Sequence, residues 1–225
     1  MGHAVGDVLG LAAAVAISPL PIIAIILLLA TTRGRLDGLL FTLSFVLGIT
    51  AVGAIMLAIG GSSGASTSHH PATWVGGLKL AIGVLLALFA VRLWSRRPKD
   101  PGQEQLPKWM AVIDRFTPPK IIGLGLLFSA GNVKNALITI AAGASISSAG
   151  ISVPQQIATL AIFVIIGSLG LLVPLAVYLI MGERAKKILG SWRDWTAQHN
   201  LAVMAVLFFV IGAKLIGDGI SILAG

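Results

Sequence analysis

The sequence predicts an all-α, polytopic membrane protein with six transmembrane helices, arranged as two inverted three-helix repeats. Of its 225 residues, 56% are hydrophobic and only 11% are charged, and the mean hydropathy is +0.97. A soluble domain carries about a quarter charged residues. Several apolar runs also reach the roughly 20 residues that a helix needs to cross the hydrocarbon core. The chain has no cysteine, so a disulfide scaffold and a thiolate metal site are excluded.

Six apolar runs are long enough to be spans. The first is too long for a cleaved signal peptide and has no basic segment before it, so we interpret it as a retained span. The predicted spans are Ala4–Ala30, Leu36–Gly61, Trp74–Trp94, Ile121–Ile146, Ile157–Met181 and Leu201–Leu223.

The basic residues predict the orientation. Thirteen of the 16 Lys and Arg residues lie in, or at the edge of, the loops between spans one and two, three and four, and five and six. Cytoplasmic loops carry an excess of Lys and Arg, so we expect these loops in the cytoplasm and both termini outside. Because topology already explains the charge, we expect no nucleic-acid partner.

The long basic loop also divides the chain. We expect a first three-helix half over residues 1–95, a linker over 96–119 and a second half over 120–225. Each half has an odd number of spans, so a repeat must be inverted, as in many transporters. Leu106–Phe116 and Arg184–Trp195 are candidates for amphipathic helices on the inner leaflet; a solvated linker is the alternative for both.

Spans one and four are each interrupted near their middle. Proline inside a helix removes a backbone hydrogen bond and clashes with the preceding turn, so carbonyl groups near Val15–Ile17 should be freed. Such breaks are tolerated where they are buried in protein or line a cavity, and paired breaks in two halves indicate a transport site. The alternative is that each only kinks a helix for packing. The interrupting residues are Ser18, Pro19 and Pro21 in span one and Gly131, Asn132 and Asn135 in span four.

Three lysines lie inside predicted spans. A lysine at a helix centre costs on the order of 3 kcal/mol, so it normally faces a cavity or a partner. Lys134 is the deepest. Lys214 can pair with Asp218 at i, i+4 spacing. Lys79 lies closer to the end of its span, where the simpler expectation is that it extends outward to the interface.

This excess of cations over the single acid Asp218 predicts a site for a phosphate, sulfate or carboxylate group, not for a cation or divalent metal. Lys134 would be the central contact, with Asn132 and Asn135 beside it. The second half of span one, starting near Pro21, would add a positive helix end. No hydrolase, zinc or nucleotide motif occurs, so we expect no enzyme activity, cofactor or metal.

These breaks resemble the lysine-exporter superfamily, and more closely its branch of peptidoglycolipid- and sulfolipid-addressing (Sap-like) proteins, the GAP family. Val133 stands where the span-four motif often has proline. The resemblance implies export of an anionic envelope lipid or glycolipid toward the cell surface. It also implies a location in the bacterial inner (plasma) membrane, with membrane lipids as partners. The segments that carry it are Gly10–Leu29, Leu78–Pro98 and Asp114–Gly143.

Two other functions are compatible with the same residues. One is efflux of a small soluble solute, such as an amino acid or an organic anion. The other is a scaffold that recruits partners through the basic linker around Arg96 and Lys108. Ala213 and Gly217 form a small-xxx-small pattern that is compatible with a homodimer but also common inside bundles.

Overall fold

The computed structural model describes residues 2–62, 73–96, 113 and 115–224, and none of them lies in a strand. The chain is helical almost throughout this part. The elements are α1 (Gly2–Ala16), α2 (Pro19–Leu29), α3 (Gly34–Ser62), α4 (Thr73–Arg96), α5 (Pro118–Ser129), α6 (Val133–Ser147), α7 (Val153–Gly167), α8 (Leu169–Met181), the 3₁₀ turn η2 (Gly182–Arg184), α9 (Ala185–Gln198) and α10 (Asn200–Ala224).

The six predicted spans correspond to three single helices and three bent helix pairs. α3, α4 and α10 are each long and apolar enough to cross a membrane. α1 and α2 meet at 52°, and α5 and α6 meet at 59°, which confirms the breaks in spans one and four. The third bent pair, at 58°, is α7 and the helical run Leu169–Gln198, which includes both α8 and α9. Span five, for which no break was predicted, is interrupted at Ser168, between α7 and α8.

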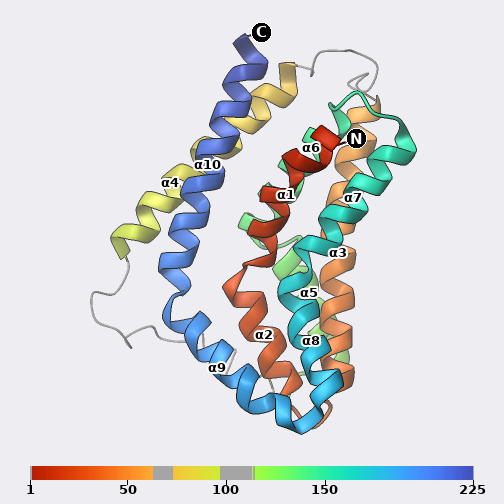
Figure 1. Cartoon of the computed structure of the whole chain (residues 1–225), viewed down its shortest axis with the longest axis vertical. Coiled ribbons are helices and arrows are strands. Elements are labelled where there is room, and N and C mark those ends of the chain that lie inside the picture. Colours follow the sequence, from red (N-terminus) through yellow and green to blue (C-terminus); the bar gives the residue numbers. More distant parts are fainter. Residues whose placement is uncertain (1, 63–72, 97–112, 114, 225) are drawn as a thin grey trace.

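Both termini lie at one end of the bundle, and α9 lies at the other (Figure 1). α4 and α10 pack along each other as one pair, α3 packs on α5 and α6, α1 packs on α7, and α2 packs on α8. These contacts join the first three spans to the last three. They are the contacts expected if an inverted repeat relates the two sets, and the division into two halves stays a prediction.

The outer surface of the bundle is apolar. Leu47 and Leu88 are each 64% exposed and Ile180 is 84% exposed, whereas the large aromatic side chains Phe41 and Phe45 are fully buried. A soluble protein rarely exposes so much contiguous apolar surface. Together with the apolar helices, this surface defines a polytopic membrane protein.

α9 confirms one of the two expected amphipathic helices. Its Ala185 and Leu189 are buried against the bundle, whereas Trp192 and Trp195 are exposed. Amphipathic tryptophan rings favour the membrane–water interface, so α9 has the character of a helix that lies in that interface. The other candidate, Leu106–Phe116, falls almost entirely outside the described residues.

Candidate functional site

The breaks of the first and fourth spans meet inside the bundle. At the first break, Ser18 has an extended backbone (φ −92°, ψ 108°), and α2 begins directly after it at Pro19. Proline is favoured in the first helical turn because its missing N–H would have no partner there. At the other break, the Asn132 side chain accepts hydrogen bonds from the backbone N–H groups of Lys134 (3.0 Å) and Asn135 (3.4 Å), so it caps α6.

Lys134 joins the two breaks. Its ammonium donates to the carbonyl oxygen of Ala14 (2.7 Å) and to the hydroxyl of Ser18. The Ser18 hydroxyl donates to Oδ1 of Asn135 (2.9 Å). Lys134 is 4% exposed, and no carboxylate pairs with it in the part of the chain that the structure describes. Each break therefore contributes polar groups to one buried cluster.

The Ala14 carbonyl is free to accept a hydrogen bond from Lys134 because α1 ends two residues later, at Ala16. In a continuous helix, Ala14 would accept from the N–H of Ser18, but Ser18 has left the helical conformation. A buried carbonyl without a partner is costly. The freed carbonyl lies one residue before the predicted range of Val15–Ile17.

At the second break, the Asn135 side chain likewise provides a hydrogen-bond partner for a backbone carbonyl group. Its Nδ2 donates to the carbonyl oxygen of Phe128 (2.8 Å), near the end of α5. Asn135 is fully buried, and its side chain links the end of α5 to Ser18 in the first span. Its role is thus positional, and the free positive charge of the cluster belongs to Lys134.

A cavity of about 390 Å³ lies against Lys134, between α4, α10 and the start of α6. Apolar side chains form most of its wall, and Arg92 adds a second cation. A small neighbouring pocket, of about 20 Å³, includes Ser18, Pro19 and Pro21. The large cavity is lined by Leu86, Phe89, Arg92, Leu93, Asn132, Val133, Lys134, Met204 and Phe208.

The start of α2 is less suited to an anion than predicted. Pro19 and Pro21 are both buried within its first turn, and neither has an N–H group. Ile22 N–H already donates to the Ser18 carbonyl. Of the first three residues of α2, only Leu20 can donate, so Lys134 supplies most of the positive character here.

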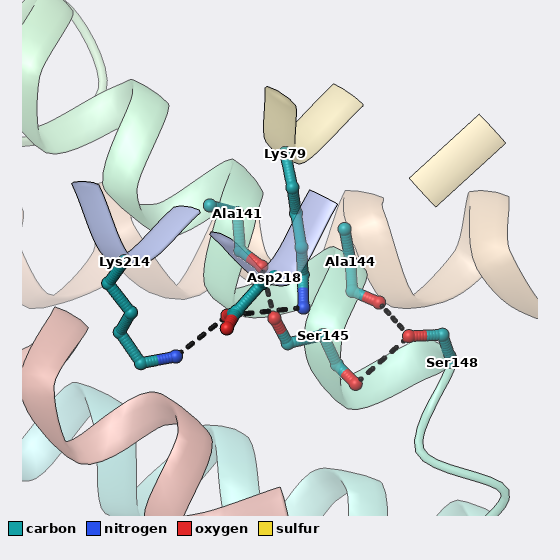
Figure 2. Close-up of polar contacts among 7 residues, drawn as sticks. All are labelled: Lys79, Ala141, Ala144, Ser145, Ser148, Lys214 and Asp218. Atoms are coloured by element: carbon teal, nitrogen blue, oxygen red, sulfur yellow. Dashed lines mark hydrogen bonds and ion pairs between the residues drawn. The ribbon is translucent and has the colours of Figure 1, made fainter. Parts of the chain in front are cut away.

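The remaining predicted residues form a separate cluster (Figure 2). Lys214 pairs with Asp218 at 2.7 Å, as predicted from their spacing. Lys79 does not extend outward: it is 6% exposed, and its Nζ lies 3.8 Å from the same carboxylate oxygen. It turns inward because Asp218, on the neighbouring α10, offers a counter-ion that the sequence of α4 alone does not reveal.

One buried acid escaped the sequence analysis. Asp37, in the first turn of α3, is 2% exposed and accepts a hydrogen bond from the Thr31 hydroxyl (2.8 Å). Arg33 lies 4.0 Å from its other oxygen. It lies within the predicted span Leu36–Gly61, but no role was predicted for it. The available signal was its place in a first helical turn, where acids are favoured.

The fold and the site define a membrane protein of the broken-helix type, with a buried cation where two breaks meet. The family model of Sap, the sulfolipid-1-addressing protein, matches residues 8–221. The chain belongs to this family, and the Sap-like branch of the predicted resemblance is confirmed. No curated protein and no solved structure gave a match. The wider likeness to the lysine-exporter superfamily stays a prediction.

Proposed function

We propose that this protein moves an anionic lipid or glycolipid of the cell envelope across the membrane, with the lipid headgroup binding at Lys134. The observation that carries this proposal is that Lys134 is buried beside a largely apolar cavity without a carboxylate partner among the described residues. An unpaired charge in such a place is costly. It is kept at lower cost if a substrate brings the opposite charge.

The wall of the cavity favours a lipid over a small polar solute. Leu86, Phe89 and Phe208 offer apolar surface, which suits an acyl chain. Arg92 and Lys134 provide two cations on the same cavity, which suit an oxyanion. The family description, which names sulfolipid addressing, agrees with a sulfated headgroup.

The direction of transport rests on the charge pattern. We place the protein in the bacterial inner membrane, with its basic loops in the cytoplasm and its termini outside. Arg92 lies in the half of α4 that is remote from the termini (Figure 1). On this topology, the cavity takes up its lipid from the cytoplasmic side, and the net movement is outward.

Native mass spectrometry of the detergent-extracted protein tests the proposal. We expect the wild type to retain an anionic or glycosylated lipid at Lys134 and Lys134→Ala to lose that copy. Lys187→Ala is the control, because it removes an equally charged side chain from the exposed face of α9. Equal lipid retention by Lys134→Ala and wild type would overturn the assignment of Lys134.

A flux assay separates lipid transport from its alternatives. In vesicles containing the wild-type protein, we expect a labelled sulfated glycolipid to change leaflets, and this to stop in Lys134→Ala. Efflux of a labelled amino acid or organic anion without lipid movement would favour the soluble-solute exporter. If neither moves, and substitutions at Arg96 and Lys108 abolish function in cells, the scaffold is favoured.

A further inference from the structure

The second charged cluster has more cations than it needs for an ion pair. Lys79 of α4 and Lys214 of α10 both approach the same oxygen of Asp218, at 3.8 and 2.7 Å. Figure 2 shows the two ammonium groups reaching this carboxylate from different sides. Asp7 also acts on Lys79 electrostatically, but it is exposed on α1. One partly exposed carboxylate oxygen therefore serves two lysines.

The cluster is not the only contact that holds α4 and α10 together. A Cβ atom on Gly83 would lie 2.9 Å from the Gly212 carbonyl oxygen, and one on Gly219 would lie 2.9 Å from that of Gly76. These glycines bring the two backbones into direct contact, which is an efficient way to pack membrane helices. Ion pairs in a low-dielectric environment can cost more to desolvate than they return. The charges at this position therefore call for another explanation.

The cluster faces the end of α6 that is remote from Lys134. Near it, Val75 and Leu78 of α4 pack with Ile140 and Ala144 of α6. Figure 2 draws Ser145 of α6 together with the cluster. Ser145 is eleven positions from Lys134 on the same helix, or about 16 Å at the rise of an α-helix. The cluster is on the side of the bundle that carries both termini (Figure 1). Lys79 and Lys214 therefore lie closer to that end of the bundle than Lys134 does.

We propose that Lys79 and Lys214 form a second oxyanion site, at which a sulfate or phosphate group displaces the carboxylate of Asp218. The geometry assigns it to the release side of the bundle. That this oxyanion is the headgroup of the transported lipid rests on the proposed function. Asp218 acts as an internal competitor: it neutralises the lysines when the site is empty and returns to them when the headgroup leaves.

Removing the charge of Asp218 tests the second site directly. Asp218→Asn keeps the size of the side chain but removes its charge, so both lysines lose their competing anion. We expect the second site to bind an oxyanion about tenfold more tightly, and release to become slower. A purely structural ion pair predicts a different result, in which Asp218→Asn lowers thermal stability and leaves ligand affinity unchanged.

The test counts bound ligands by native mass spectrometry of the full chain, with 3-O-sulfogalactosylceramide as the probe. We expect the wild type to bind two copies, Lys134→Ala to bind one, and the double variant Lys79→Gln/Lys214→Gln to bind one. The control is Lys186→Gln/Lys187→Gln, which removes the same charge from α9 and should bind two. Inorganic sulfate is the second probe. Sulfate binding as tight as that of the lipid would support the oxyanion site and identify a free anion as its ligand.

The outcomes separate the two proposals. Two copies on the Lys79→Gln/Lys214→Gln variant overturn the second site, whatever Lys134→Ala does. Loss of a copy from this double variant, with none lost from Lys134→Ala, supports the second site and contradicts the proposed function at Lys134. If the double variant does not fold, Asp218→Asn decides, and unchanged affinity in that variant overturns the proposal.

Discussion

Ser18 links the two broken spans, because its hydroxyl accepts from Lys134 and donates to Asn135. Ser18→Ala leaves Oδ1 of Asn135 without this donor and Lys134 with only the Ala14 carbonyl. Leaving a buried polar group unsatisfied costs about 1–3 kcal/mol. We expect the free energy of unfolding in detergent to fall by about that amount. The control, Ser191→Ala, removes an exposed hydroxyl that bonds only to Ile188 of its own helix. An equal effect of both substitutions would contradict this role of Ser18.

At the same scale, the sequence indicates which residues form the site but not every partner. The sequence predicts one site that contains Lys134, Ser18 and Asn135. A lysine and two helix breaks inside apolar spans all need polar partners, so they are expected to lie together. The inward direction of Lys79 could not, since it depends on Asp218 from a helix 139 positions later. Asp37 was missed because burial of a charge at a span edge depends on neighbours such as Thr31.

Among the helices, the α4–α10 pair depends on the absence of side chains at its contact points. A Cβ atom on Gly83 would lie 2.8 Å from the backbone nitrogen of Ile216. Backbone atoms cannot move aside as a flexible side chain can, so Gly83→Ala must separate the helices locally. Overpacking of this kind costs about 1–3 kcal/mol. We expect a lower unfolding temperature for Gly83→Ala.

Gly77→Ala is the matched control for this prediction. It makes the same chemical change on the same helix, but a Cβ atom on Gly77 meets nothing within 4 Å. Alanine has a higher helix propensity than glycine, so we expect this variant to be as stable as the wild type or slightly more stable. If both variants unfold at the same temperature, the glycines do not determine the packing of α4 on α10.

The helix breaks also differ in how well the sequence predicts them. Pro19 and Pro21 predict the first break, because proline disrupts a helix wherever it packs. The interruption between α7 and α8, at Ser168, has no proline at the break itself. There, a Cβ atom on Gly170 would lie 2.0 Å from the carbonyl oxygen of Ala16. α8 thus approaches the end of α1 closely, and this tertiary contact leaves no periodic pattern in the sequence of span five.

For the molecule as a whole, the orientation in the membrane determines what the two cationic sites do. The cavity at Lys134 and Arg92 includes the C-terminal part of α4, whereas the cluster at Lys79 lies near the N-terminal end of that helix. If the end that carries α9 is cytoplasmic, as the positive-inside rule predicts, the first site loads from the cytoplasm and the second releases outward. The opposite orientation would make the same pair of sites an importer.

Cysteine labelling decides between these orientations, and the chain is suited to it because it contains no cysteine of its own. His3 on α1 and Lys187 on α9 are both exposed and lie at opposite ends of the bundle. In intact cells, we expect a membrane-impermeant maleimide to label His3→Cys, and to label Lys187→Cys only after lysis. The reverse pattern would place the basic loops outside, and the proposed export would have to be rejected even if both sites bind the lipid.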